Sequence, residues 1–147
     1  MLGRLARYLR FVGCDTLYVR GLSDDELISR AEAEGRLVVT RDRLLSRRVP
    51  GALLLVSPLL PEQWRAVRSA WPWVPTEPTF VRCSECNGSL VPAAPPAGPV
   101  QPELPPDVRA GRSPLYACSA CGHLYWGGSH TARVRRDIAR WEQGEPP

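Results

Sequence analysis

The sequence predicts an α/β protein, with a parallel sheet wound with helices in its first half and a small metal-binding module in its second. Two observations predict this organisation. Short apolar runs alternate with helical segments through the first half, a pattern typical of a parallel sheet covered by helices. In the second half, four of the five cysteines occur as two Cys-x-x-Cys pairs, which is the spacing of a metal site.

Length and charge limit the class of protein. At 147 residues, the chain has room for one ordinary domain, or for a small domain and a metal-stapled one. No apolar run approaches the ~20 residues of a membrane span, and no signal peptide is evident, so we expect a soluble, cytoplasmic protein. The net charge is +4, and all 19 basic residues are arginine. This basic charge is compatible with two interpretations, a surface that binds phosphate groups or a mildly basic surface that is only solvated.

Three helices are predicted in the first half from local signals. The first has apolar residues at helical spacing and ends at Gly13. The second begins with a capping box of Ser23 and Glu26 and ends at Gly35. The third extends from Pro61 to Trp71, with proline at its start.

Three strands are predicted between these helices, at Thr16–Val19, Leu37–Val39 and Leu53–Val56. The second and third are continuous apolar runs, typical of strands that are buried on both faces of a sheet. A short helical stretch follows Arg43. The chain opens directly on a helix, without the strand with which such a sheet normally begins.

A cluster of prolines around Pro75 predicts a domain edge, which divides the chain into residues 1–76 and 77–147. In the second part, the stretch Pro92–Pro106 contains seven prolines in fifteen residues, and we expect an exposed loop there. A strand is predicted at Leu124–Trp126, and a final helix follows. We expect Ser129 to cap this helix.

The cysteine pairs predict one structural zinc ion. Its ligands are Cys83, Cys86, Cys118 and Cys121. The two Cys-x-x-Cys turns can each present two thiolates to one Zn²⁺ ion at ~2.3 Å, and the four thiolates then form a tetrahedron. A closed site has no open position for water, so the zinc stabilises the fold rather than catalysing a reaction. The alternative is two unrelated redox-active or free cysteine pairs.

Three acidic residues are candidate catalytic groups, namely Asp24, Asp25 and Asp42. Each lies where a strand or loop meets a helix, and the carboxyl ends of parallel strands line the binding crevice of such sheets. Clustered carboxylates hold Mg²⁺ or Mn²⁺, which activates water for attack on a phosphodiester. The alternative is structural: the first two complement a helix dipole, and Asp42 caps a short helix.

Several motifs occur in the order found in a known family. Met1–Arg10 and Gly13–Tyr18 resemble its opening segment, and Ser23–Leu27 and Thr40–Arg43 resemble its acidic motifs. Its ribbon and tail are matched by Cys83-x-x-Cys86-Asn87-Gly88, Cys118-x-x-Cys121-Gly122 and Tyr125-Trp126-x-Gly128-Ser129-His130. Together these motifs resemble the Mut-seven C-terminal RNase family, a PIN-like nuclease domain with an appended zinc ribbon.

The resemblance implies a metal-dependent ribonuclease that acts on RNA, with Asp24, Asp25 and Asp42 as ligands of Mg²⁺ or Mn²⁺. Arg41 and Arg43 are then candidate phosphate contacts. A second hypothesis is a catalytically silent RNA- or protein-binding module, in which the ribbon and the final helix act. The arginines of that helix are Arg133, Arg136 and Arg140. A third, the toxin half of a toxin–antitoxin pair, is disfavoured by the ribbon.

The resemblance also bears on the start of the chain. PIN-like domains usually begin with a central strand that ends in a metal-binding aspartate, just before the segment that Met1–Gly3 resembles. We therefore expect a true start further upstream. The other interpretation is a form that lacks this strand and one metal ligand, and with them nuclease activity.

Overall fold

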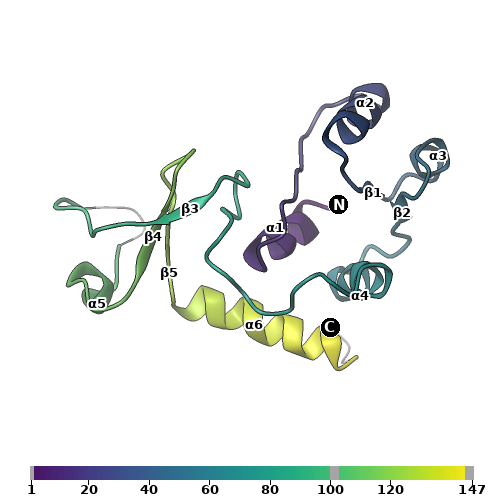
Figure 1. The fold of residues 1–147 in the computed structure, drawn as a ribbon. Coiled ribbons are helices and arrows are strands. Elements are labelled where there is room, and N and C mark those ends of the chain that lie inside the picture. The colour runs from purple at the N-terminus through teal and green to yellow at the C-terminus, as the bar shows by residue number, and fades with distance from the viewer. Residues whose placement is uncertain (1, 100–102, 145–147) are drawn as a thin grey trace.

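Helices and two short strands make up the first half of the chain in the computed structural model, which describes residues 2–99 and 103–144. These elements are α1 (Gly3–Phe11), α2 (Asp24–Glu34), β1 (Val39–Thr40), α3 (Arg43–Arg48), β2 (Leu53–Leu54) and α4 (Leu60–Ala70). Figure 1 shows α2 and α3 at one end of the molecule, with α1 and α4 nearer its middle.

The second half is built around an antiparallel sheet of three strands. Its elements are β3 (Leu90–Pro92), α5 (Pro106–Arg109), β4 (Leu115–Cys118), β5 (Leu124–Trp126) and α6 (Ser129–Glu142). The sheet and α5 lie at the end of the molecule opposite α2, and α6 extends back toward α4 (Figure 1). The structure therefore confirms a mixed α/β protein, with β5 at the predicted residues.

The helices of the first half form where the local signals predict them. At the start of α2, Ser23 Oγ accepts a hydrogen bond from the Glu26 N–H, and the Glu26 carboxylate accepts one from the Ser23 N–H. The helix ends at Gly35, whose φ of 61° is left-handed and favours glycine. In α4, Pro61 occupies the first turn, where its missing N–H is not needed.

The parallel sheet is smaller than predicted. β1 and β2 are paired in parallel, with Val39 opposite Leu53 and Thr40 opposite Leu54. Among the described residues this pair is the whole of the parallel sheet, so a larger PIN-like sheet wound with helices is not confirmed. β1 also begins at Val39, two residues later than predicted. Leu37, the predicted first residue, lies before the strand, and its side chain is 56% exposed.

The predicted strand at Thr16–Val19 is absent from the described structure, where these residues form an extended segment without a strand partner. The Thr16 N–H donates to Asn87 Oδ1 at 3.0 Å, and the Thr16 carbonyl accepts from Arg10 Nε at 2.8 Å. Side chains thus bind the backbone groups that a neighbouring strand would bind in a sheet.

The antiparallel sheet brings the two cysteine pairs together. In its register, Leu90 of β3 lies opposite Cys118 of β4, and Tyr116 lies opposite Tyr125 of β5. The first cysteine pair precedes β3, and the second pair begins at Cys118, the last residue of β4. Both pairs therefore lie at the same end of the sheet.

The proline-rich stretch is more structured than predicted. Pro92 ends β3, and Pro106 begins the short helix α5, since a proline is tolerated in the first turn of a helix. Leu104 is 3% exposed and is buried with Val108 of α5 and Leu115 of β4. The prediction of an exposed loop is therefore wrong at the two ends of the stretch, and its residues 100–102 lie outside the described part of the chain.

The main core joins α1, α4 and α6. Its fully buried members include Leu5, Trp64, Val67, Val134 and Ile138. The final helix, predicted as part of the second domain, thus packs against helices of the first half. The boundary between residues 1–76 and 77–147 stays a prediction. Gly128 rather than Ser129 is the N-cap of α6, and no side chain caps the helix.

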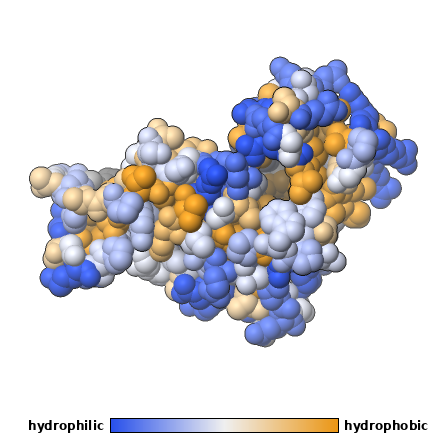
Figure 2. All heavy atoms as spheres, viewed as in Figure 1, coloured by the Kyte–Doolittle hydropathy of each residue, from blue (hydrophilic) through white to orange (hydrophobic). Residues whose placement is uncertain are grey.

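A groove of about 450 Å³ lies between α1, β1 and α4. Leu5, Leu17, Val39 and Trp71 contribute to its apolar lining. Figure 2 shows hydrophobic surface in the hollow beneath α2. Within the described residues, no helix combines the length and the apolar character that crossing a membrane requires.

Candidate metal centre and candidate RNA site

Four cysteine sulfurs converge at the end of the antiparallel sheet. The ligand atoms of Cys83, Cys86, Cys118 and Cys121 all lie within 4.8 Å of one another. The Sγ atoms of Cys83 and Cys121 are 3.7 Å apart, and those of Cys86 and Cys118 are 3.5 Å apart. A tetrahedron with Zn–S bonds of ~2.3 Å has edges of about 3.8 Å. The cluster therefore fits one zinc ion, and its sulfurs are too far apart for disulfides.

The backbone of each turn folds tightly around its sulfurs. In the first turn, the Cys83 N–H donates to the Gly88 carbonyl at 2.8 Å, and the Asn87 N–H donates to the Cys83 carbonyl at 2.9 Å. Asn87 has a φ of 70°, which asparagine tolerates better than most residues. A Cβ on Gly88 would lie 2.8 Å from the Cys118 Sγ, so glycine allows this close approach.

Burial and hydrogen bonds together shift the pKa values of the Cys86 and Cys118 thiols apart. Burial raises the pKa of Cys118, but N–H groups of Cys121 and Ala120 and the neighbouring thiols lower it, to a net value of about 7. Burial is the main cause that raises the pKa of Cys86 to about 12. Zinc binds thiolates, so it displaces these protons when it binds.

Tyr125 and His123 lie beside the cluster but supply no ligand to it. The Tyr125 hydroxyl is 3.1 Å from the Cys83 Sγ and accepts a hydrogen bond from the Ser84 N–H at 3.1 Å. The His123 ring packs on Tyr125 with a centroid separation of 4.9 Å. His123 does not belong to the group of four potential ligands found among the described residues. Four thiolates already complete a tetrahedral zinc site.

Asp42 lies at the carboxyl end of β1 and caps α3. Its Oδ1 accepts hydrogen bonds from the N–H groups of Leu44 and Leu45, at 2.6 Å and 3.1 Å. Its own N–H donates to Thr40 Oγ1 at 3.0 Å. The residue is exposed. The Asp42 side chain therefore caps α3, which is the structural role given above as the alternative to catalysis. It does so at the edge of the sheet where the catalytic role was predicted.

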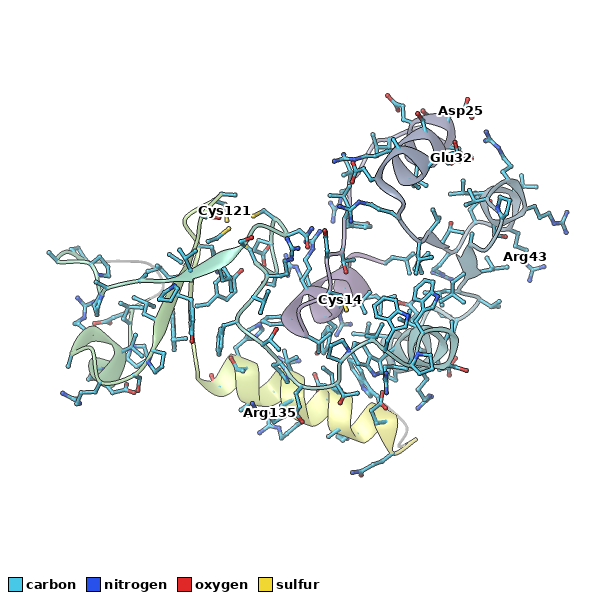
Figure 3. The ribbon with its side chains drawn as sticks, in the orientation of Figure 1. Cys14, Asp25, Glu32, Arg43, Cys121 and Arg135 are labelled. Atoms are coloured by element: carbon cyan, nitrogen blue, oxygen red, sulfur yellow. The ribbon has the colours of Figure 1, made fainter. Side chains whose placement is uncertain are left out.

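Asp24 and Asp25 lie at the start of α2 and contact Arg48 of α3. Arg48 Nη1 is 3.6 Å from Asp24 Oδ2, and Arg48 Nη2 forms a short ion pair with Asp25 Oδ1. Figure 3 shows Asp25 at the outer end of the molecule, far from Cys121 in the ribbon. These contacts join α2 to the C-terminal end of α3, whereas Asp42 caps its N-terminal end.

The three carboxylates are not gathered into one site. Among the described residues, the four cysteines are the one group of three or more potential ligands whose donor atoms lie within 4.8 Å of one another. Asp24 and Asp25 share the partner Arg48, and Asp42 does not join them in a group of potential ligands among the described residues.

The arginines predicted to contact RNA lie on two surfaces. Arg41 and Arg43 are exposed on either side of Asp42. On α6, Arg133 is exposed and lies 4.0 Å from Asp137, and Arg136 and Arg140 are exposed as well.

Comparison with protein families gives a match over nearly the whole chain. The family model of the Mut7-C RNAse domain matches residues 1–138. The chain belongs to the Mut7-C RNAse domain family. This membership indicates a ribonuclease-like function, and the cysteine cluster fits zinc binding. A search of curated proteins and a search of solved structures each gave no match.

Sequence reasoning missed the residues that connect the cysteine cluster of this Mut7-C protein to α1. Arg10, the last residue of the opening segment that resembles the family, is buried and donates to carbonyls in the first cysteine turn. Asn87 contacts Asp15 and Thr16 through its side chain. These partners are more than seventy residues apart along the chain, and no local pattern signals such contacts.

Proposed function

We propose that this Mut7-C protein is a ribonuclease that cleaves RNA phosphodiester bonds in the presence of Mg²⁺ or Mn²⁺. The observation that carries the proposal is the match of the RNAse domain model over residues 1–138. The four-cysteine cluster, which fits one zinc ion, is then a structural support of the enzyme, since a tetrahedron of thiolates leaves no position for a reacting water.

The surroundings of Asp42 support its choice as the leading catalytic candidate. It is exposed at the carboxyl end of a parallel strand, where ligands commonly bind in sheets of this kind. The N–H groups of Leu44 and Leu45 both donate to Oδ1 of Asp42, so its second oxygen, Oδ2, is left to bind a cation. The flanking Arg41 and Arg43 are exposed and can bind the phosphates of an RNA strand.

The carboxylates do not form a ready-made site for a divalent ion. Asp24 and Asp25 share Arg48 as an ion-pair partner, and neither joins Asp42 in a group of potential metal ligands among the described residues. We therefore assign no chemical step to a bound Mg²⁺ or Mn²⁺. The proposal is that Asp42 is one ligand, and that Asp24 and Asp25 become ligands only if they separate from Arg48.

The test compares cleavage and binding of RNA by Asp42→Asn. Asparagine caps a helix about as well as aspartate, so the variant keeps its fold. It lacks the negative charge that would help to hold a divalent ion, and we expect cleavage in Mn²⁺ to fall by about two orders of magnitude or more, because the carboxylate would be one of the groups that bind the ion. Circular dichroism checks the fold, and fluorescence anisotropy checks RNA affinity, which we expect to be nearly unchanged.

Glu32→Gln is the matched control, because Glu32 is an exposed carboxylate on α2 that has no predicted catalytic role. It is expected to cleave RNA at the wild-type rate. Undiminished cleavage by Asp42→Asn, in preparations free of other nucleases, would contradict the assignment of Asp42.

A second candidate function is a catalytically silent module that binds RNA or protein. It is favoured by the ion pairs of Arg48, which occupy Asp24 and Asp25. In this case the binding surface would be the ribbon together with Arg133, Arg136 and Arg140 of α6. The same assay separates the two functions, because a silent module binds RNA but leaves it intact in Mg²⁺ and Mn²⁺.

A further inference from the structure

A buried arginine connects α1 to the first cysteine turn. Arg10 is 5% exposed and lies in the last turn of α1. Its Nη1 donates to the carbonyls of Ser84 and Glu85, at 3.0 Å each, and its Nε donates to the Thr16 carbonyl at 2.8 Å. Ser84 and Glu85 are the two residues between the cysteines of the first pair. The guanidinium therefore binds the backbone of a metal-binding turn directly.

The charge of Arg10 requires compensation, because a buried cation is costly unless it is paired and hydrogen-bonded. Carbonyl oxygens satisfy its donors but carry no net charge. The cysteine cluster would supply that charge with zinc bound, since four thiolates around Zn²⁺ carry a net charge of about −2. Burial lowers the pKa of Arg10, and the charges of Cys83, Cys86 and Glu85 act against that decrease. The arginine and the metal centre therefore stabilise each other.

Asn87, which directly follows the first cysteine pair, makes a second connection to the same region. Its Nδ2 donates to Asp15 Oδ1 at 2.6 Å, and its Oδ1 accepts from the Thr16 N–H at 3.0 Å. Asp15 also contacts Arg36 at 3.1 Å and Arg82 at 3.6 Å. The cysteine turn thus holds the segment that leaves α1 and that lines the groove beside β1.

We infer that Arg10 is the buried counter-ion and positioning residue of the zinc centre, and that zinc binding orders residues 14–16 through Arg10 and Asn87. The coupling is reciprocal: if the folded α1 segment increases zinc affinity, zinc must stabilise that segment by the same factor. The inference concerns metal binding, and it holds whether or not the protein cleaves RNA.

The first test measures zinc affinity of the full chain by competition with a chromophoric chelator. Partners behind a metal's ligands commonly change metal affinity by about 10- to 100-fold, and we expect a loss of that size in Arg10→Met. Arg10→Lys keeps the charge but loses the forked donor geometry, so it should recover part of the affinity. Circular dichroism of the zinc-bound forms confirms that the variants are folded.

Arg7→Gln is the matched control. Arg7 lies one turn earlier on α1 and contacts the same cysteine turn, but through an exposed ion pair with the Glu85 carboxylate at 2.8 Å. Exposed pairs are weak, so zinc affinity should stay within about fivefold of wild type. If Arg10→Met binds zinc as tightly as Arg7→Gln does, the inference is overturned.

A second variant decides the matter if Arg10→Met fails to fold. Asn87→Gly keeps a residue that tolerates the φ of 70° and removes only the side-chain contacts to Asp15 and Thr16. Hydrogen exchange is measured with ZnCl₂ and after chelation. In wild type, zinc should slow exchange at residues 14–16, and in Asn87→Gly this effect should be smaller, because only the Arg10 connection remains. Equal exchange with and without zinc in the wild-type chain would overturn the inference.

Discussion

At the scale of single residues, the metal centre depends on positions that hold the backbone close to sulfur. The N–H of Gly88 lies 3.4 Å from the Cys86 Sγ, and the N–H of Cys86 lies 3.5 Å from the Cys83 Sγ. Such N–H groups stabilise thiolates and orient them before the metal binds. The ligands and their immediate neighbours are therefore the places where single substitutions should act most strongly on zinc.

Replacing Cys118 with serine should release the metal. Cys118 is 3% exposed and supplies one of the four sulfurs, so its loss opens the tetrahedron. Metal analysis of reduced protein should find about one zinc per wild-type chain and less than half of that in Cys118→Ser. Cys14→Ser is the control, because Cys14 is outside the cluster. This variant should therefore keep its zinc. Equal zinc content in both variants would refute this assignment.

Gly88→Ala tests the close approach of backbone to sulfur. The added Cβ would lie 2.8 Å from Cys118 Sγ and 3.0 Å from Ala120 Cβ, so the turn must shift. We expect zinc affinity to fall by about tenfold or more, the size of effect typical of changes next to metal ligands. Gly98→Ala is the control, since a Cβ there meets no atom within 4 Å. Chelator competition measures both, and indistinguishable affinities would contradict the predicted clash.

At the scale of elements, the proline-rich stretch is anchored at both ends. Its start completes β3, where the Ala93 N–H donates to the Leu115 carbonyl at 2.9 Å. Its end carries Leu104 and enters α5, whose Val108 is fully buried. Removal of the whole stretch would therefore remove part of the small core of the ribbon, whereas the exposed residues 97–99 can be removed at little cost.

Leu104→Ala should destabilise the protein. Leucine-to-alanine changes in a packed core cost about 2–5 kcal/mol, and Leu104 is 3% exposed beside Val108 and Leu115. Leu44→Ala serves as the control, because that leucine is 69% exposed and its loss should change stability by about 0.5 kcal/mol or less. Urea unfolding of the zinc-bound proteins measures both. Equal midpoints would show that Leu104 does not anchor the stretch.

At the scale of the whole molecule, α6 closes the core of the first half. Trp141 packs against Tyr8 of α1 with a centroid separation of 4.8 Å and against Trp64 of α4 at 6.1 Å. The Trp64 indole N–H donates to Glu142 at 2.7 Å, and Tyr8 donates to Asp137 at 2.5 Å. The final helix is thus a structural part of this fold as well as a carrier of exposed arginines.

Trp141→Ala should therefore destabilise the whole molecule. Removal of a buried tryptophan costs about 3–5 kcal/mol, and Trp141 is 7% exposed between α1 and α4. Trp73→Ala is the matched control, because Trp73 is 65% exposed and should have a much smaller effect. Thermal unfolding followed by circular dichroism compares the two. Equal melting temperatures would mean that α6 does not stabilise the core.

The sequence by itself determined the features that depend on near neighbours. The capping box at Ser23, the end of α2 at Gly35 and the strand at Leu124–Trp126 follow from spacings of a few residues. The four zinc-site cysteines follow from two short turns whose chemistry is specific to metals. Such signals can be read from the chain because the interacting groups are close along it.

Only the tertiary structure decided which distant segments meet. It joined Arg10 to the first cysteine turn, paired Asp24 and Asp25 with Arg48, and left Thr16–Val19 without a strand partner. The physical reason is that burial and backbone hydrogen bonds are satisfied by whichever groups the fold brings close, and side chains can replace a strand in that role. No short sequence pattern indicates that these groups will meet, since the two partners of each contact lie tens of residues apart along the chain.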